Sequence, residues 1–501
     1  MPDIIITTLN ARYIHASLGA RYLYANMGEL QPNTEIQEFI INTRPIDIAE
    51  KLLASSPKII GIGVYIWNTQ QVTELAALIK TISPETILIL GGPEISYETK
   101  EQTMFRYADF VITGLADLAF SELCNQVLNK KPPIEKIIKA AVVKLDQIIM
   151  PYDYFTDEDI ANRVIYVEAS RGCPFKCEFC LSSLDKTAWP FDLEKFLSHL
   201  DNLYKRGVRQ FKFVDRTFNL KIETSIKVLN FFLARMDDSL FLHFELIPDH
   251  LPEKLKSIIK KFPAGSLQFE IGIQSFDDST QQVISRKQDN DKTNENIKWL
   301  VNETTAHLHT DLIVGLPGET IDSFATGFDQ LIDLKPHEIQ VGILKRLRGT
   351  PIIRHTTDYQ MKYNPIAPYN ILSNKVIAFN EMQRMSRFSR YWDMIANSGR
   401  FKHSLPLILG TTPFKNFLAL SDWLFATSTQ THKISLNKLF SYLYDAMTKE
   451  LDISSVIAAE SLTKDFSLSG LKGSPAFKDN IVTIVKKQTD RKLPKRQVRH
   501  L

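Results

Sequence analysis

Three of the four cysteines in this chain, Cys173, Cys177 and Cys180, stand close together with C-x3-C-x2-C spacing. A structural zinc site needs four ligands, usually close together in the sequence. No fourth Cys or His lies near the motif, because the next histidine, His199, is 19 residues beyond Cys180. A cubane [4Fe–4S] cluster usually takes four thiolates, so three would leave one iron open to chelate the amino and carboxylate groups of S-adenosylmethionine (SAM). The motif therefore predicts a SAM-binding [4Fe–4S] cluster. Zinc, or a cluster with a remote fourth ligand, is the alternative.

Two further residues bear on this interpretation. Phe179 lies between the last two predicted ligands, where its ring could shield the cluster and pack on the adenine of SAM. Cys124 stands alone in an amphipathic helical pattern, and we expect it to be a core residue. So few cysteines, and so clustered, are atypical of a secreted disulfide framework.

The cysteine motif follows one of six apolar segments that alternate with helical patterns. This alternation predicts parallel strands joined by helices, and here an open or partial (β/α) barrel. The cysteine loop, 170–183, leaves the carboxyl end of the first strand, where the active site of such a barrel lies. The predicted strands are 164–169, 210–214, 241–246, 267–273, 306–313 and 338–343.

The first 135 residues repeat the alternation with short runs rich in Ile and Val, which predicts a doubly wound parallel α/β sheet. Ligands of such sheets lie at the carboxyl ends of the strands. One strand ends in Gly91-Gly92, which would form a flat floor for a large ring or a nucleotide tail. The predicted strands are 4–9, 59–64, 87–90 and 110–113, and the loops that follow them are 10–19, 65–70, 91–97 and 114–117.

Several segments resemble the radical SAM superfamily, and more closely its cobalamin-binding subgroup with a C-terminal domain of unknown function. In the barrel these are 173–180, 214–219, 270–275, 311–320 and 344–351; in the N-terminal sheet they are 61–68 and 89–96. The resemblance implies SAM contacts from the barrel and cobalamin contacts from the sheet. The residues it implies are Phe179, Asp215, Glu270, Gly272 and Gln274 for the barrel, and Trp67, Asn68, Gly91 and Gly92 for the sheet.

The resemblance also implies a mechanism. A one-electron reductant such as flavodoxin or ferredoxin reduces the [4Fe–4S] cluster, SAM is cleaved, and the adenosyl radical abstracts hydrogen from an unreactive carbon. If cobalamin binds, it would carry a methyl group to the substrate, which makes a C-methyltransferase the leading activity. The substrate, a small molecule or a peptide, is unknown.

The loop after the first strand departs from the subgroup. Its best-marked members carry Asp-x-His-x-x-Gly there, with the histidine bound to cobalt. Here His15 is present, but Tyr13 replaces the Asp and Gly19 comes one position late. An imidazole bound to a metal usually needs an orienting partner. Cobalamin without a histidine ligand from the protein, or no cobalamin, is therefore the expectation. In the fourth loop, a Gly-Glu-x-Glu stretch becomes Gly114-Leu-Ala-Asp117.

The domain prediction follows from these patterns. We expect a cobalamin-binding-like α/β domain at 1–135, a linker at 136–160, a radical SAM barrel at 161–355, a mainly helical domain at 356–485 and a basic tail at 486–501. Helical patterns in the fourth region cover 371–385, 412–426 and 436–447. The tail holds seven Lys or Arg residues and one Asp, and we interpret it as a solvated terminus.

Composition narrows the class of protein. The chain has 501 residues, 44% of them hydrophobic, and a formal net charge of +3. No apolar run reaches the roughly 18 residues of a membrane-spanning helix, and the first residues do not resemble a signal peptide. We expect a cytoplasmic protein with neither a membrane nor a nucleic acid as partner.

Two alternatives remain to the C-methyltransferase. One is a cobalamin-independent radical SAM enzyme that catalyses a cyclisation, a rearrangement or an oxidation. A methylthiotransferase of this kind would carry further cysteines upstream, and only Cys124 precedes the motif. The other alternative is a non-catalytic iron–sulfur or zinc protein whose basic tail binds nucleic acid.

Overall fold

The computed structural model describes residues 1–473, 475, 477, 499 and 500. These fall into two compact units, and each is considered by itself. The first unit comprises Met1–Arg216, Lys345–Ile353 and Asn364–Tyr369, and the second comprises Thr217–Leu344, Arg354–Tyr363 and Asn370–Leu501. Most of the predicted basic tail at 486–501 lies outside the described residues.

The first unit is built around a six-stranded sheet in the order β2-β1-β3-β4-β5-β6, with every neighbouring pair parallel. The four predicted strands are present, and two further strands complete the sheet. Both occupy its edges, where half-exposed polar residues or short length hide the apolar pattern. The strands are β1 (Ile4–Asn10), β2 (Thr34–Ile40), β3 (Ile59–Gly63), β4 (Ile87–Gly91), β5 (Phe110–Thr113) and β6 (Ile137–Lys139).

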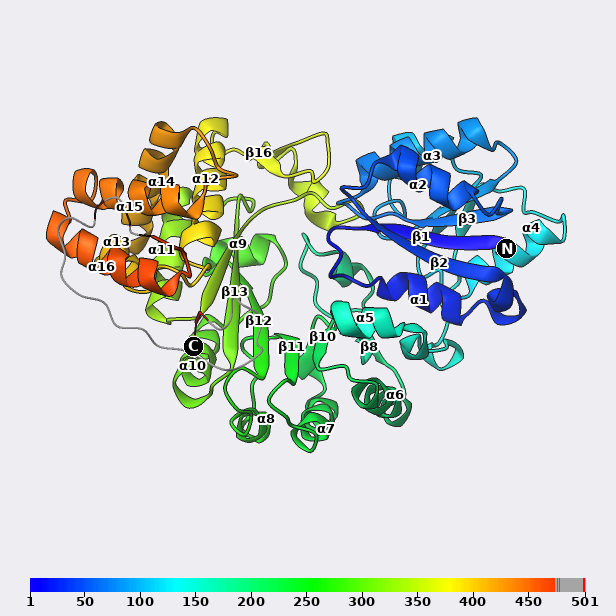
Figure 1. Ribbon diagram of the computed structural model, residues 1–501, viewed down its shortest axis with the longest axis horizontal. Coiled ribbons are helices and arrows are strands. Elements are labelled where there is room, and N and C mark those ends of the chain that lie inside the picture. Colours follow the sequence, from blue (N-terminus) through cyan, green and yellow to red (C-terminus); the bar gives the residue numbers. More distant parts are fainter. Residues whose placement is uncertain (474, 476, 478–498, 501) are drawn as a thin grey trace. The chain divides into compact units, whose positions relative to one another are not determined.

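Helices cover both faces of this sheet, as expected for a doubly wound fold (Figure 1). On one face, α2 (Pro45–Leu53) and α3 (Thr69–Ile82) pack their apolar stripes against the sheet. On the other face, α1 (Leu18–Ala25) and α4 (Ala119–Leu128) do the same. Cys124 belongs to this second core and is fully buried, as its helical pattern predicts.

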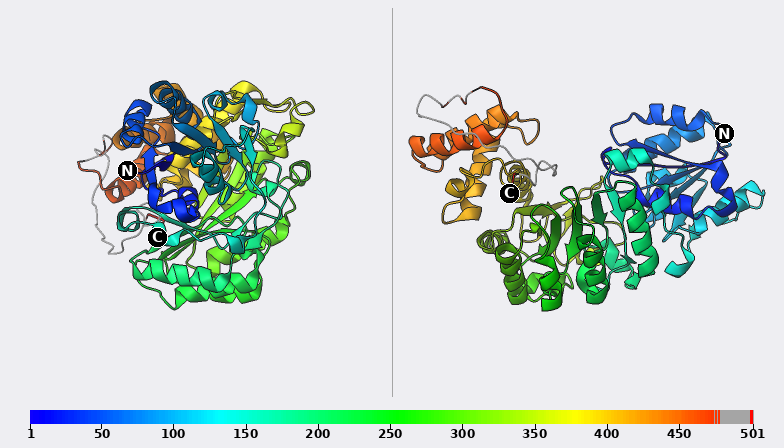
Figure 2. Two further views of the ribbon diagram at one scale, coloured as in Figure 1. Left: turned by 90° about the vertical axis from the view of Figure 1, so that its right-hand side faces the viewer. Right: turned by 60° about the horizontal axis from the view of Figure 1, so that its bottom comes forward.

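The second sheet has the order β14-β13-β12-β11-β10-β7 and forms the predicted partial barrel. The pairs within each unit are parallel. Figure 2 shows its strands flanked by the green helices of the crossovers. The strands are β7 (Ile165–Val167), β10 (Gln210–Phe213), β11 (Phe241–Leu246), β12 (Leu267–Gln274), β13 (His307–Val314) and β14 (Glu338–Ile343). The helices are α5 (Asp157–Asn162), α6 (Leu193–Lys205), α7 (Ile222–Leu233), α8 (Glu253–Ile259), α9 (Asp278–Val283), α10 (Asn290–Glu303) and α11 (Ile321–Asp333).

The C-terminal region is mainly helical, as predicted, and its helices cluster together in Figures 1 and 2. Their core is aromatic: Phe388 and Trp392 of one helix pack on Phe417 of another. The helices are α12 (Phe379–Ile395), α13 (Leu405–Leu409), α14 (Pro413–Ser428), α15 (Leu436–Lys449) and α16 (Ser455–Leu468). Among the described residues, no helix combines the length and the apolar composition that crossing a membrane would require.

One helical prediction, 371–385, is wrong over its first half. Ile371–Ser373 forms β16, which pairs antiparallel with β15 (Lys362–Tyr363). The side-chain oxygen of Asn374 then accepts hydrogen bonds from the backbone of Val376 and Ile377, and α12 begins only at Phe379. The asparagine competes with the helix for backbone donors, which a count of apolar positions does not register.

Candidate functional site

The cysteine loop is held closed by its own backbone. The amide of Cys173 donates to the carbonyl of Asp185 at 2.7 Å, and the amide of Cys180 donates to the carbonyl of Cys177 at 3.1 Å. The hydroxyl of Ser183 lies within hydrogen-bond distance of the carbonyls of both Cys177 and Cys180. The three cysteines therefore share one compact loop that begins where β7 ends.

The three thiols form no disulfide and lie near enough to affect one another's charge. The pKa of Cys173 is raised to about 11, mainly by burial and in smaller part by the neighbouring thiols of Cys180 and Cys177. In the described part of the chain, no three His, Cys, Asp or Glu side chains are placed to hold one metal ion. A cubane cluster does not require three side chains to converge on one ion, because each of its thiolates binds a different iron. The donor set fits a cluster, whose binding would displace the thiol protons.

The two other predicted residues of this region differ in their surroundings. Phe179 is half-buried within the cysteine loop. Asp215 is buried, and its carboxylate accepts from the amide of Ala169 at 2.9 Å and from the hydroxyl of Ser170 at 2.6 Å. Burial raises the pKa of Asp215 to about 7. Asp215 thus fixes the end of β7 from which the cysteine loop departs.

In the second unit, the predicted SAM-binding residues gather at the carboxyl end of β12. The carboxylate of Glu270 lies 2.9 Å from Nε2 of His243 on β11. The guanidinium of Arg286 donates to the carbonyl of Gly272. The pairing of β12 with β13 shifts register between Gly272 and Gln274, and Gln274 takes a φ of 71°. This bulge re-aims the side chains at the strand end, where ligands of such sheets bind.

A pocket of about 210 Å³ opens at the carboxyl edge of the N-terminal sheet. Its walls are mostly apolar, and glycines of β3 and β4 form part of its floor. Such a pocket suits a flat, largely apolar group that enters from the loops. The lining residues include Thr7, Thr8, Ser17, Tyr22, Gly61, Gly63, Tyr65, Gly91, Gly92, Leu115, Asp117, Phe120 and Arg171.

Gly91 and Gly92, the two glycines predicted to form the floor, differ in what a larger side chain would meet. Gly92 has a φ of 109°, and a Cβ there would lie 2.6 Å from the carbonyl oxygen of Val64. A Cβ at Gly91 would meet no atom nearer than the carbonyl oxygen of Ile112, at 3.7 Å. Gly92 is therefore needed by the backbone, whereas Gly91 leaves room in the pocket.

Trp67 and Asn68 do not line this pocket. The Trp67 ring stacks on Tyr65 with centroids 4.5 Å apart, and its Nε1 donates to the carbonyl of Leu9. The buried amide of Asn68 donates to the carbonyls of Leu9 and Gly63, and its oxygen accepts from the amide of Tyr65. Both residues set the position of Tyr65, which does line the pocket.

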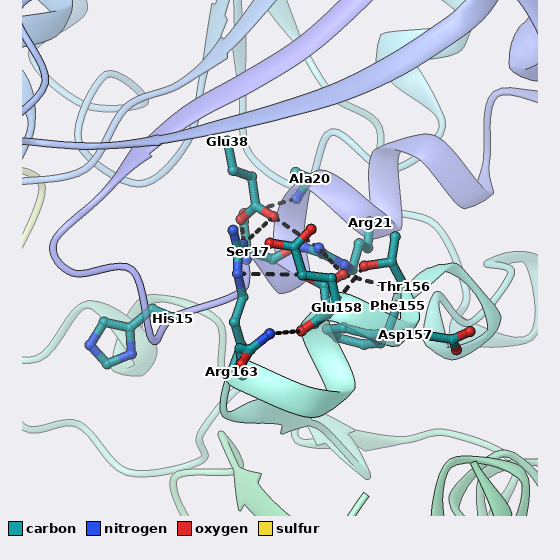
Figure 3. A network of polar contacts seen from close by, with 12 residues as sticks. His15, Ser17, Ala20, Arg21, Glu38, Phe155, Thr156, Asp157, Glu158 and Arg163 are labelled. Atoms are coloured by element: carbon teal, nitrogen blue, oxygen red, sulfur yellow. Dashed lines mark hydrogen bonds and ion pairs between the residues drawn. The ribbon is translucent and has the colours of Figure 1, made fainter. Parts of the chain in front are cut away.

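His15 also lies outside the pocket lining. Its Nδ1 is 2.7 Å from the hydroxyl of Tyr166, and burial lowers its pKa, so the ring is neutral near pH 7. Tyr13, which stands where the subgroup has Asp, hydrogen-bonds to Glu158 instead. Figure 3 shows His15 directed away from the neighbouring charged side chains.

Those charged side chains form a buried network that the sequence did not reveal (Figure 3). Arg21 donates to Glu38 at 2.8 Å and to Asp159 at 2.7 Å, and Arg163 donates to Glu38 at 2.9 Å. Two cations meet two anions, so the network is neutral as a whole. It fastens α5, immediately before β7, to α1 and to β2.

A second network joins the loop after β4 to the segment after β14. Arg348 binds Glu94 at 3.0 Å and Glu98 at 2.6 Å, and Arg346 binds Glu98 at 2.6 Å. The hydroxyl of Tyr369 donates to Glu94 at 2.8 Å. The segment 344–351 resembles the family, but its partners could not be read from the sequence.

A third contact couples two family-like segments of the second unit. The hydroxyl of Ser275, at the end of β12, donates to Oε1 of the buried Glu319. Among the described residues, Oε2 of Glu319 has no hydrogen-bond partner, and burial raises the pKa of this carboxyl to about 8. The Gly-Leu-Pro-Gly-Glu turn marks the position in the sequence but not its partner.

The comparisons with protein families cover most of the chain. Residues 167–331 match the Radical SAM superfamily, and residues 4–124 match the B12 binding domain. The chain is a radical SAM protein with a B12-binding domain. Residues 357–499 match a protein family of unknown function, DUF4080. The cofactors of this protein are accordingly a [4Fe–4S] cluster and SAM, and its B12-binding domain supports cobalamin as a third.

Individual relatives agree with this assignment. An uncharacterised methyltransferase of Pyrococcus horikoshii is 29% identical over 206 residues, which are 36% of this chain and 44% of the relative. The cobalamin-dependent radical SAM methyltransferase TokK of Streptomyces tokunonensis is 22% identical over 348 residues, 62% of this chain and 50% of TokK. This radical SAM protein thus spans about half the length of these curated relatives.

A solved structure shares the fold. The cobalamin-dependent S-adenosylmethionine radical enzyme OxsB matches with a TM-score of 0.61 at 14% identity, over 92% of this chain and 83% of that one. The order of α/β sheet, partial barrel and helical region is therefore that of a known fold.

Proposed function

We propose that this radical SAM protein is a cobalamin-dependent C-methyltransferase, with Cys173, Cys177 and Cys180 as the ligands of its [4Fe–4S] cluster. The observation that carries the proposal is the glycine-floored pocket, which lies in the same unit as the cysteine loop. When bound, the cluster supplies the electron that cleaves SAM, and cobalamin supplies a carrier for the methyl group.

The cysteine loop is built to hold three thiolates without a fourth. Its backbone is closed by the contacts of Cys173 with Asp185 and of Ser183 with two cysteine carbonyls. Asp215 fixes the strand end from which the loop departs. Phe179, half-buried in the same loop, would exclude water from one side of the bound cluster.

The end of β12 would orient SAM. Gly272 leaves the backbone accessible at the bulge, and Arg286 holds its carbonyl in place. Glu270, paired with His243, offers a carboxylate to the polar groups of SAM, and Gln274 offers an amide. These assignments follow from the resemblance of 270–275 and from the half-buried positions of the three residues on β12.

The pocket of the N-terminal sheet would take the nucleotide tail of cobalamin. Its apolar walls and the open space above Gly91 suit a flat heteroaromatic base. His15 is held by Tyr166 and does not line the pocket. We therefore propose that cobalamin binds without a histidine ligand from the protein.

The test is anaerobic reconstitution of the full chain with iron, sulfide and hydroxocobalamin, followed by SAM and dithionite. We expect 5′-deoxyadenosine to form and corrin absorption bands to remain with the protein after gel filtration. Formation of 5′-deoxyadenosine without retained corrin would reduce the proposal to cobalamin-independent radical chemistry. No 5′-deoxyadenosine from a cluster-loaded chain would reject the enzyme proposal altogether.

The methyl-transfer step needs a separate measurement, because the substrate is unknown. Once a strong reductant has taken the bound hydroxocobalamin from Co(III) to Co(I), SAM labelled with deuterium in its methyl group should transfer that group to cobalt. The products are S-adenosylhomocysteine and methylcobalamin of matching mass. An unlabelled corrin after prolonged incubation would argue against methyl transfer through cobalamin.

A further inference from the structure

The side chain of Arg171 stands between the pocket and the cysteine loop. It lies two residues before Cys173, and it is about 10% exposed. One end of its guanidinium binds Asp117 at 2.8 Å, and Nε binds Glu168 at 2.9 Å. Asp117 follows β5 of the N-terminal sheet, whereas Glu168 follows β7 of the barrel. A single cation therefore joins two anions from two different sheets.

The pocket side of this triad is part of the pocket wall. Arg171, Asp117 and Tyr22 all line the pocket. The guanidinium carbon of Arg171 lies 4.3 Å from the centroid of the Tyr22 ring and 5.4 Å from that of Phe191. A group that enters the pocket therefore meets a charged side chain already clamped between two rings and two carboxylates.

The backbone between Arg171 and the first predicted cluster ligand has little freedom. Arg171 lies in β8 (Ser170–Arg171), which pairs with β9 (Trp189–Pro190) across the base of the cysteine loop. Gly172 has a φ of 87°, and a Cβ there would lie 2.9 Å from the carbonyl oxygen of Asp185. Cys173 then donates to that same carbonyl. A displacement of Arg171 would therefore be passed to Cys173 rather than absorbed.

We propose that Arg171 is a positioning residue that links occupancy of the pocket to the geometry of the cysteine loop. This rests on the proposed function, since it takes the pocket as a corrinoid site and the three cysteines as cluster ligands. A pocket occupant restrains Asp117 and Tyr22, and a bound cluster restrains the backbone at Cys173. Both favour the same position of Arg171, so each site binds more tightly when the other is filled.

The proposed linkage between pocket and cluster can be tested by binding measurements, without an activity assay. Hydroxocobalamin is titrated anaerobically into the full chain, with and without a reconstituted cluster, and its dissociation constant is obtained by equilibrium dialysis. We expect the cluster to tighten hydroxocobalamin binding about fivefold or more. The ratio of the two constants is the readout, because a direct effect of a mutation on the pocket changes both constants and cancels.

The variant Asp117→Asn cuts the pocket arm of the triad while keeping the size of the side chain. We expect its ratio to fall close to one. The control is Asp109→Asn, which weakens an Asp–Lys pair beside the same sheet, the contact of Asp109, just before β5, with Lys80 of α3 at 2.9 Å. Neither residue lines the pocket, so the ratio of this control should equal that of the wild type.

The electron paramagnetic resonance spectrum of the reduced cluster provides the second readout. With enough dithionite to reduce the added corrinoid as well as the cluster, the corrinoid should shift the cluster signal of the wild type and of Asp109→Asn, but not that of Asp117→Asn. A wild-type ratio of one, or an Asp117→Asn ratio equal to the wild type, overturns the linkage while leaving the corrinoid site intact. Failure of every form to bind hydroxocobalamin overturns the proposed function itself, and the linkage with it.

Discussion

Nε of Arg348 lies 3.0 Å from Oε1 of Glu94, although the two residues are 254 positions apart in the sequence. The Glu94 side chain is only 3% exposed. A carboxylate this deeply buried is tolerated because a guanidinium and the hydroxyl of Tyr369 both contact it. The pair shows how the loop of the B12-binding domain that begins with Gly91-Gly92 is fixed from outside that domain.

Arg348→Ala should lower the free energy of unfolding by about 3–5 kcal/mol, because it leaves Glu94 buried without its cation. Urea denaturation followed by far-UV circular dichroism would measure the loss. The matched control is Lys260→Ala, which breaks an exposed pair with Glu303 and should cost about 0–1 kcal/mol. Equal losses in the two variants would contradict a stabilising role for the buried pair.

Substituting Ala at the two glycines of the pocket floor should have two different effects, one on ligand binding and one on stability. Gly91→Ala should fold normally but weaken hydroxocobalamin binding about tenfold, because the methyl group enters the open pocket. Gly92→Ala should instead lower stability by about 3 kcal/mol, through its positive φ and the clash with Val64.

Gly207→Ala is the control for backbone conformation alone. Gly207 has a φ of 104°, but a Cβ there would meet no atom within 4 Å. It should cost about 1 kcal/mol and leave hydroxocobalamin binding unchanged. If Gly91→Ala binds hydroxocobalamin as tightly as the wild type, the pocket is not the corrinoid site.

Replacing any one of Cys173, Cys177 and Cys180 with Ala should abolish stable cluster binding, because the loop then offers only two thiolates. Iron and sulfide content after anaerobic reconstitution, and the visible absorption of the cluster, would measure the loss. Cys124→Ala is the control: Cys124 is fully buried in α4, and burial raises its pKa to about 12. Retention of a full cluster by a triad variant would assign the ligands elsewhere.

Glu319 should make stability fall as pH rises. Its pKa is about 8 in the folded protein because of burial, against an ordinary value of 4.5. Between these values the folded state keeps a proton that the unfolded state releases, so stability decreases by up to about 1.4 kcal/mol per pH unit and levels off above pH 8.

Glu319→Gln removes the titrating proton and should flatten this slope between pH 5 and pH 8, as measured by urea midpoints. Glu303→Gln, at an exposed site, should keep the slope of the wild type. An unchanged slope in Glu319→Gln would show that the carboxyl is already ionised in the folded protein.

The sequence by itself determined the features that are local along the chain. Cys173, Cys177 and Cys180 are separated by so few residues that they must share a loop. Apolar runs marked ten of the strands and the alternation of two α/β sheets, since buried parallel strands need apolar residues on both faces. The edge strand β2 was missed because its polar residues face solvent, and β16 because Asn374 captures backbone donors locally.

Only the tertiary structure decided which distant side chains meet. Asp117 and Arg171 are 54 positions apart, and Glu94 and Arg348 are 254 apart; neither pairing leaves a periodic signal. The same is true of the pocket, whose lining comes from four strands of the N-terminal sheet and their loops, from α1 and α4, and from Arg171 in β8. Burial also decided the state of Glu319, because a carboxyl has an ordinary pKa until the fold removes water from it. Spacing in the sequence identified the three predicted cluster ligands, and tertiary packing decided which side chains surround them.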